Sequence, residues 1–273
     1  MSANVDLATA RAIERAEIEA WRDAFAAASR ETRDGLGLAE RDFGHAFALA
    51  SRWLASLLFN RVIGLGLFEP VTDGTLDAIA AHFAEVGEDH ALNVSPLAEP
   101  EGLGERLAAR GYSTFFHHVK WVRDTSPPAP VESTLRVERV RPERAEVFAG
   151  LLVRVLARGA PLRRDWMAES VGRTGWSHYL ALDGETPVGC AAMRAHDDVA
   201  WLGWGATLPE ARGRGAQSLL LAARLDDARA AGCRLATTET GPNDPDLNPV
   251  SWRNVQRAGF RVAYDRPSWV RPE

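Results

Sequence analysis

The chain has 273 residues, enough for one large or two small domains with a well-filled core. Its 46% hydrophobic and 25% charged residues are typical of a soluble globular protein. The net charge of −5 and the dispersed arginines argue against a nucleic-acid partner. No apolar run reaches the roughly 18 residues that a membrane span needs. We therefore expect a cytoplasmic protein without nucleic-acid or membrane partners, and without a metal, because Cys190 and Cys233 lack metal-ligand spacing.

The first half predicts helices that alternate with strands. An amphipathic helix is expected over residues 6–30, where apolar residues recur at helical spacing. The further elements expected in this half are strands at 46–50 and 60–67, a helix at 75–86, a strand at 91–94, a helix at 103–110 and a last strand after Gly111-Tyr112. Residues 125–131 contain three prolines and predict a linker.

The second half predicts a mixed, mainly antiparallel sheet with helices on both faces. The elements expected are a strand at 135–140, helices at 142–157 and 164–171, a hairpin of strands 177–182 and 187–194, a strand at 199–207, a helix between Gly215 and Gly232, a strand at 235–239, a helix at 249–258 and strands at 260–264 and 268–271. In the helix after Gly215, Arg224 is expected on the solvent side. The fold class predicted for the chain is α/β (α+β).

A strand, a glycine-rich loop and a helix follow one another directly between Val199 and Gly232. The loop reads Arg212-Gly213-Arg214-Gly215. Small residues before a helix leave the N–H groups of its first turn unpaired, and the helix dipole favours an anion there. The loop therefore predicts a phosphate site, with an ordinary strand-to-helix turn as the alternative. Two nucleotide-binding patterns are excluded, because no Gly-Lys-Ser/Thr follows and the third glycine of the dinucleotide motif is missing.

At this loop the sequence resembles the GNAT superfamily of acyl-CoA-dependent N-acyltransferases. Arg212-x-x-Gly215-x-Gln217 is similar to the family's Gln/Arg-x-x-Gly-x-Gly/Ala signature at two of three positions, Gln217 being the departure. Further on, Asn248-x-x-Ser251 followed by Ala258-Gly259-Phe260 resembles the family's Asn-x-x-Ala…Gly-Phe ending. The resemblance covers residues 132–273 well and the first half faintly. It implies two GNAT-like domains, each with a mixed, mainly antiparallel sheet flanked by helices.

The resemblance also implies that acetyl-CoA (CoA) binds at the loop and the elements around it. The cofactor-binding residues that it implies are Ala206, Thr207, Leu208, Arg212, Gly213, Arg214, Gly215, Ala216, Gln217, Ser218, Asn248, Ser251 and Asn254. The larger side chain of Gln217 would narrow or shift the pyrophosphate pocket, although its backbone amide is retained.

The reaction implied by the resemblance is transfer of an acetyl group from acetyl-CoA to an amine. An alkyl ammonium must first lose a proton, which costs about 4 to 5 kcal/mol at pH 7. Glu239, at the end of the strand 235–239, is the first candidate base, with a solvated strand-end glutamate and a water relay as alternatives. Many family members protonate the leaving thiolate with a tyrosine where this chain has Val255. Candidate donors are Asn254, Ser251 and Tyr264, yet a thiol with a pKa of about 8.5 also leaves with little help.

The two halves echo each other in one local pattern. Gly111-Tyr112 and Gly259-Phe260 each have a tryptophan ten residues after the glycine, followed by Val-Arg. This repeat predicts a duplicated domain, with boundaries at 1–124 and 132–273 around the linker 125–131. The segment 68–74 of the first copy has two carboxylates and no arginine in place of the phosphate loop. We therefore expect a degenerate first domain and one CoA per chain.

The sequence thus favours an N-acetyltransferase acting on a small-molecule or peptide amine, as a monomer or homodimer. A catalytically inactive acyl-CoA-binding sensor is the alternative that Val255 leaves open, and the loop at 212–215 disfavours a purely structural module. The residues that could line an acceptor pocket are Trp166, His178, Trp201 and Trp204. Tryptophan on a sheet is more often part of the core than a ligand contact.

Overall fold

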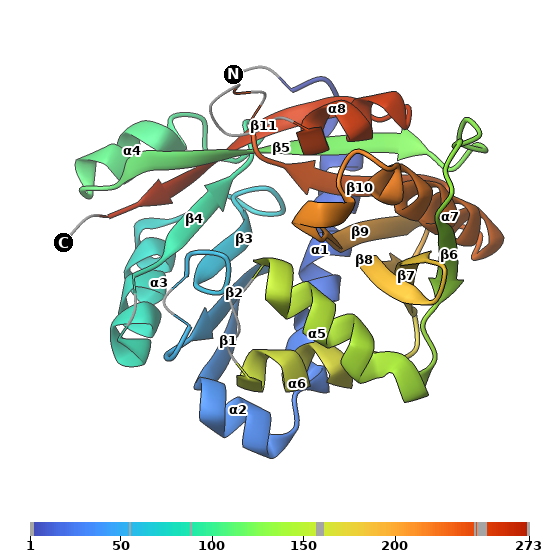
Figure 1. Ribbon diagram of the computed structural model, residues 1–273. Helices are drawn as coiled ribbons and strands as arrows, with labels where there is room; N and C mark the ends of the chain where they lie inside the picture. Colours follow the sequence, from blue (N-terminus) through green and yellow to red (C-terminus); the bar gives the residue numbers. More distant parts are fainter. Residues whose placement is uncertain are drawn as a thin grey trace. The chain divides into compact units, whose positions relative to one another are not determined.

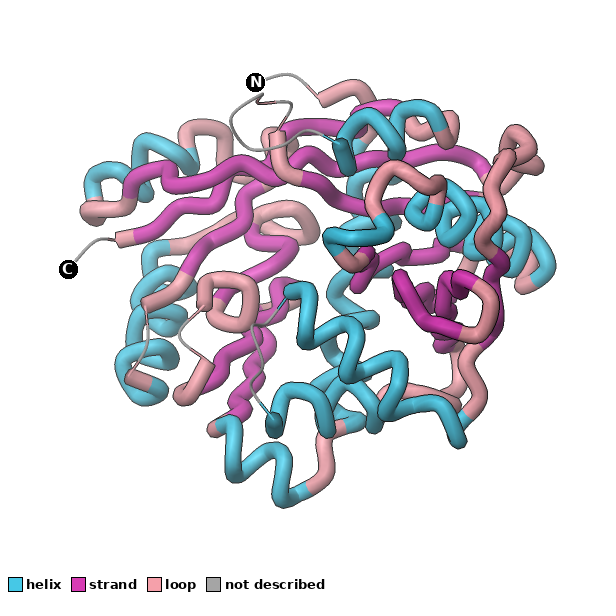
Figure 2. The backbone as a smooth tube through the Cα atoms, viewed as in Figure 1, coloured by secondary structure: helices cyan, strands magenta, loops and turns pink. Residues whose placement is uncertain are grey.

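The structure is a computed structural model that describes residues 3–54, 56–87, 89–156, 161–242, 244 and 250–271. The chain folds into two compact units. The first comprises Met1–Ala26, Arg33–Lys120 and Val262–Glu273, and the second comprises Ala27–Thr32 and Trp121–Arg261. Within the described residues, no helix combines the length and the hydropathy needed to cross a membrane. Figure 1 labels the elements, and Figure 2 separates helices, strands and loops by colour.

Helices and a mixed sheet make up the first unit. Its elements are α1 (Leu7–Ala27), α2 (Arg30–Leu36), β1 (Leu38–Phe43), β2 (Ala46–Ser51), β3 (Arg61–Leu65), α3 (Asp73–Val86), β4 (Ala91–Val94), α4 (Leu103–Ala109), most of β5 (Ser113–Asp124) and nearly all of β11 (Arg261–Val270). The strand order β1-β2-β3-β4-β11 is antiparallel except for the parallel pair β3 and β4.

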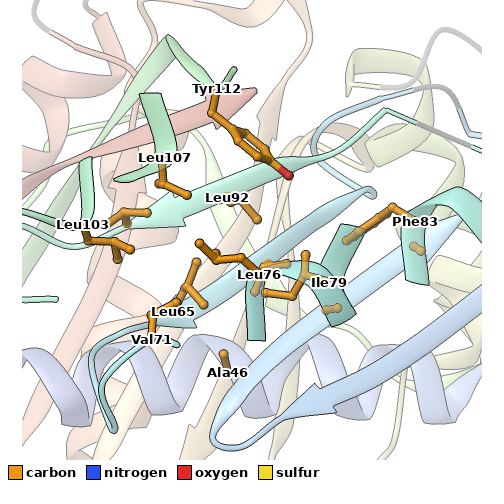
Figure 3. Close-up of a cluster of buried hydrophobic side chains, with 14 of the residues drawn as sticks. Ala46, Leu65, Val71, Leu76, Ile79, Phe83, Leu92, Leu103, Leu107 and Tyr112 are labelled. Atoms are coloured by element: carbon orange, nitrogen blue, oxygen red, sulfur yellow. The ribbon is translucent and has the colours of Figure 1, made fainter. Parts of the chain in front are cut away.

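The apolar core of this unit lies between the sheet and the helices α3 and α4. Leu76, Ile79 and Phe83 recur at helical spacing on α3 and meet Leu92 of β4 (Figure 3). Leu107 of α4 joins the same cluster and is fully buried. The helices predicted at 75–86 and 103–110 are present as α3 and α4.

A cluster of buried charges joins α1 to the strands of the first unit. Glu17 is fully buried and accepts hydrogen bonds from Lys120 at 2.6 Å, Arg266 at 2.8 Å and Arg61 at 3.2 Å. Burial alone would raise the pKa of Glu17, but the charges of Arg266, Lys120 and Arg61 hold this pKa well below its usual range. The carboxylate therefore stays ionised.

The second unit contains the glycine-rich loop at residues 212–215 for which the sequence predicts a phosphate site. Its elements are β6 (Arg136–Arg139), η1 (Pro142–Arg144), α5 (Ala145–Leu156), α6 (Pro161–Glu169), β7 (Trp176–Asp183), β8 (Thr186–His196), β9 (Val199–Thr207), η2 (Pro209–Ala211), α7 (Ala216–Ala230), β10 (Leu235–Thr240) and α8 (Val250–Arg257). The order β10-β9-β8-β7-β6 is antiparallel except for the parallel pair β9 and β10.

Helices cover both faces of this second sheet. On β7, His178 contacts Phe148 of α5, whereas the next residue, Tyr179, donates a hydrogen bond to Asp227 of α7 at 2.6 Å. Because successive residues of a strand point to opposite faces, α5 and α7 lie on opposite sides of the sheet. The mixed α/β fold with a mainly antiparallel sheet flanked by helices is therefore confirmed.

The duplicated sequence pattern forms the same helix end twice. Gly111 after α4 and Gly259 after α8 both have φ 84°, and each N–H bonds to the carbonyl three residues earlier. The following Tyr112 and Phe260 each bond to the carbonyl five residues earlier. This left-handed helix ending needs a residue without Cβ, which accounts for glycine at both places.

The end of β5 (residues 121–124) and nearly all of β11 belong to the unit of the other sequence copy. At the end of β5, Trp121 belongs to the second unit, where its Nε1 donates to Thr240 at 3.0 Å. At the end of β11, Trp269 pairs with Leu92 of β4 in the first unit (Figure 1). The guanidinium of Arg123 lies 5.9 Å from the ring centroid of Phe260, and that of Arg271 lies 5.9 Å from Tyr112. The end of β5 and nearly all of β11 are thus exchanged between the two sequence copies.

Because of this exchange, the boundaries of the compact units differ from those of the predicted sequence domains. The last strand was expected within 132–273, yet residues 262–270 belong to the first unit. Residues 125–135 form neither helix nor strand, as the prolines predicted. The boundaries 1–124, 125–131 and 132–273 remain our proposal for the duplicated copies.

The structure differs from the predicted elements at one helix end, one unpredicted strand and one strand that was predicted as two. The helix expected over 6–30 stops at Ala27, because Ser29 accepts the N–H of Thr32 and starts α2. Strand β1 was not predicted, since its edge sequence Glu40-Arg41-Asp42 is charged. The two strands expected at 260–264 and 268–271 are one strand, β11, which continues through Pro267 and pairs with β4 from Ser268 onward.

Candidate functional site: a cavity beside the bulge of β9 and the start of α7

Strand β9 carries a bulge opposite β8. Cys190 pairs with Ala206 and Ala192 pairs with Gly203, so that Trp204 and Gly205 together face the single residue between the two β8 positions. Trp204 adopts φ 51°, a left-handed conformation that is uncommon for a bulky residue. Bulges interrupt the ladder and occur often beside functional sites.

Beyond the bulge, β9 and its parallel neighbour β10 no longer pair. Their register runs from Val199 and Leu235 to Trp201 and Thr237 and ends there. The hydroxyl of Thr238 donates to the Leu202 carbonyl at 2.8 Å and bridges the strands at the point of divergence. The backbone of 205–207 is therefore released from β10.

The loop that follows β9 leaves the N-terminus of α7 uncapped. Gly213 and Gly215 have φ 77° and 86°, and no side chain caps the helix at Gly215. Leu219 N–H bonds to the Gly215 carbonyl, so the N–H groups of residues 216–218 lie before the first intrahelical bond. No acidic residue occupies the first turn. The arrangement suits an anion.

The two loop arginines have different surroundings. Arg214 donates to Asp183 at 2.6 Å, and this hydrogen bond lowers the pKa of the Asp183 carboxyl. Arg212 lines the cavity and pairs with no carboxylate among the residues that the structure describes. Of the two cations predicted for phosphate binding, Arg212 is therefore the one available to a ligand.

Gln217, the departure from the family signature, connects α7 to α8. Its Nε2 donates to Ser251 at 2.9 Å, and its Oε1 accepts from Asn254 at 2.7 Å. Arg257 donates to Asn254 at 3.3 Å and extends the network. The Gln217 side chain thus occupies the helix interface, and its backbone N–H stays in the uncapped turn.

A cavity of about 530 Å³ gathers these features. Of the predicted cofactor-binding residues, those that line it are Ala206, Thr207, Arg212, Gly213, Gly215, Ala216, Gln217, Ser218, Ser251 and Asn254. Leu208 is buried and its N–H bonds to Val188, and Arg214 is paired as described, so neither belongs to the lining. Asn248 lies outside the described residues.

The catalytic candidates occupy different places. Ser251 lines the cavity but is bound by Gln217. Glu239 is half-buried on β10, between Thr238 and Thr240, and does not line the cavity. Tyr264 lies in the first unit, fully buried, where its hydroxyl donates to Glu14 at 2.8 Å. Burial raises the pKa of Tyr264 well above its usual range, so we no longer consider it a proton donor.

Sequence reasoning missed two arginines that line the cavity. Arg257 follows Asn254 by three residues and shares its helix face, a spacing that could have indicated it. Arg224 was expected on the solvent side of α7, which is wrong, since it is only 3% exposed. No local signal places a charged side chain in the interior.

The aromatic residues considered for an acceptor pocket lie mainly in the core. Trp166, Trp201 and His178 are buried, and Trp204 is half-buried. Trp176 stacks on Trp204 with ring centroids 4.8 Å apart. Burial lowers the pKa of His178 to about 3, so its ring is neutral at physiological pH.

The comparison with protein families agrees with this geometry. Residues 152–260 match the Acetyltransferase (GNAT) family, a range that contains the bulge, the loop and α8. This part of the chain is therefore a GNAT acetyltransferase domain. No curated protein sequence matches the chain significantly.

Solved structures show the same fold over most of the chain. A GCN5-related N-acetyltransferase from Kribbella flavida is 17% identical, with a TM-score of 0.64 over 92% of this chain and 95% of that one. A similar protein from Sphaerobacter thermophilus is 15% identical, with a TM-score of 0.60 over 83% and 81%. A tandem GNAT protein from the clavulanic acid biosynthesis pathway is 19% identical, with a TM-score of 0.54 over 77% and 73%. At these identities the likeness concerns the fold.

Proposed function

We propose that the protein is an acyl-CoA-dependent N-acetyltransferase that acts on the amine of a small molecule or peptide. The observation that carries the proposal is the uncapped N-terminus of α7, with Gly213, Gly215 and Arg212 on one cavity. A pyrophosphate fits these residues, because the first-turn N–H groups of α7 and a cation meet there, and no carboxylate of the described residues lines the cavity. Acetyl-CoA would supply the activated acyl group.

Different residues of the cavity would bind different parts of CoA. The N–H groups of 216–218 and Arg212 would hold the phosphates, and Ser251 and Asn254 would border them on α8. The released backbone of Gly205, Ala206 and Thr207 would accommodate the arm of the cofactor, as the resemblance implies. Isothermal titration with CoA tests the assignment, which fails if the folded chain does not bind CoA.

Glu239 remains our candidate for the base that removes the proton from the amine. We expect Glu239→Gln to lower the rate of thiol release, with the pH optimum moving upward. Without the base the amine must deprotonate in solution, and an alkyl ammonium has a pKa of about 10.4. The measurement is a pH–rate profile with acetyl-CoA and an accepted amine. An unchanged rate and profile would exclude Glu239 as the base.

We expect one CoA per chain, because the corresponding helix start in the first unit is closed. The side chain of Thr72 accepts the N–H of Thr75 and caps α3, and Asp73 adds a negative charge to the first turn. Hydrogen bonds from Arg106 and Arg110 lower the pKa of Asp73, so this carboxylate stays ionised. Isothermal titration measures the stoichiometry, and a value of two would reveal a second site.

An inactive acyl-CoA sensor is the alternative, and Val255 favours it. This residue is only 2% exposed and offers no proton to a leaving thiolate. A panel of amines, aminoglycosides, amino acids and peptide N-termini, followed by free thiol release, separates the two functions. Turnover of any acceptor supports the enzyme, whereas tight CoA binding without turnover supports the sensor.

A further inference from the structure

Helix α7 carries a buried cation without a carboxylate partner. Arg224 is 3% exposed, and no Asp or Glu of the described residues pairs with it. Its Nε donates to the Leu220 carbonyl at 2.9 Å. Charged side chains are rarely buried unless they are paired. Burial accordingly lowers the pKa of Arg224 to about 10, and the guanidinium remains positive at physiological pH.

The bulge of β9 fixes the position of this charge. Nη1 of Arg224 donates to the carbonyls of Ala192 at 3.3 Å and Gly203 at 3.4 Å, the pair of residues that borders the bulge. Nη2 makes no hydrogen bond with any residue that the structure describes, and the side chain lines the same cavity as Gly205. The cavity therefore has an uncompensated positive charge beside the bulge.

This charge lies away from the phosphate loop. Arg224 follows Ala216 by eight residues, which corresponds to about 12 Å along the axis of α7. Gly205, Arg224 and most residues of the segment 212–218 line one cavity, so an elongated ligand with its phosphates at the loop would reach Gly205 and Arg224 with its other end. Under the proposed function, on which this inference rests, that other end is the thiol of CoA.

We propose that Arg224 stabilises the thiolate form of bound CoA, in a protein whose proton-donor position is Val255. A free thiol has a pKa of about 8.5, and a cation in a poorly hydrated site favours its ionised form. In the transfer, the amine nitrogen forms the amide C–N bond, the C–S bond of the thioester breaks, and the sulfur leaves as a thiolate beside the guanidinium. In the complex with free CoA, the thiol loses its proton to solvent and gives the same thiolate. Arg224 thereby assists departure of the thiolate by electrostatic stabilisation.

The other titratable groups beside Arg224 do not change their protonation between about pH 6 and 9. Burial raises the pKa of Cys190 on β8, and burial together with Asp227 raises the pKa of Tyr179 on β7. Among the described residues that line the cavity, the other charged side chains are those of Arg212 and Arg257. A thiol that titrates between about pH 6 and 9 in the complex therefore belongs to the ligand.

The test is the pKa of the CoA thiol in its complex with the full chain, followed by the ultraviolet absorbance of the thiolate. We expect this pKa to lie at least one unit below that of free CoA, and to stay low in Arg224→Lys. In Arg224→Gln, which keeps hydrogen-bond donors but loses the charge, it should return to the value of free CoA. If Arg224 only holds the bulge in place, the thiol pKa in both variants will equal that in the wild-type complex.

A second measurement needs no variant. Since the bound thiolate is favoured, the affinity for CoA should rise about tenfold between pH 6 and 9, whereas the affinity for S-methyl-CoA, which has no thiol, should stay constant. Equal pH dependence of the two ligands, or a low thiol pKa in Arg224→Gln, would overturn the role of Arg224. Absence of CoA binding to the wild-type chain would instead refute the proposed function.

Discussion

Gly213→Glu is expected to weaken CoA binding by about 100-fold while the protein stays folded. Gly213 lines the cavity with φ 77°, and a Cβ built there meets nothing within 4 Å. The substitution therefore adds no clash, but places a carboxylate beside the N–H groups that should hold phosphate. A hundredfold change corresponds to about 2.8 kcal/mol of binding free energy.

The matched control is Gly232→Glu beyond the other end of α7. Gly232 has φ 81° and equally open space, so the two variants share the cost of a left-handed side chain, about 1 to 2 kcal/mol. Thermal unfolding should show similar losses of stability in both, and isothermal titration should show weak CoA binding in Gly213→Glu alone. If folded Gly213→Glu binds CoA with unchanged affinity, the loop does not bind the phosphates of CoA.

A fragment that begins at residue 132 is expected not to fold, although it contains the whole loop. Trp121 is 1% exposed and contacts Trp252 of α8, with ring centroids 5.0 Å apart. Loss of a buried tryptophan costs about 3 to 5 kcal/mol, comparable to the total stability of many domains. The fragment 132–273 would also carry β11 without its partner β4.

The fragment 121–261 is the control, because it keeps Trp121 and the end of β5 that belongs to the second unit, and omits nearly all of β11. We expect it to give a cooperative thermal transition and to bind CoA, whereas 132–273 should give neither. Coexpression of 1–131 with 132–273 should restore both properties, since together they contain both exchanged strands. The strand exchange would be contradicted if 132–273 alone matched 121–261 in melting temperature and CoA affinity.

Most helices and the core strands could be predicted because their signals are local. In α3 the apolar spacing of Leu76, Ile79 and Phe83 marks the buried face within a few turns. The loop before α7 was found in the same way, since glycines before an apolar helical repeat specify an open helix start. Strand β1 was not predicted, because an edge strand with charged residues lacks the apolar alternation of a buried strand.

By itself, the sequence determined the uncapped start of α7 and the two matching Gly-aromatic helix ends, because both depend on backbone conformation within about six residues. The partner of each final strand and the burial of Arg224 were settled by the tertiary fold. A strand's pattern shows which residues are apolar but does not identify the neighbouring strand, so the exchange of β5 and β11 could not be foreseen. Arg224 is buried because a bulge formed by β8 and β9 offers it two carbonyls, and those residues meet α7 only in the folded chain.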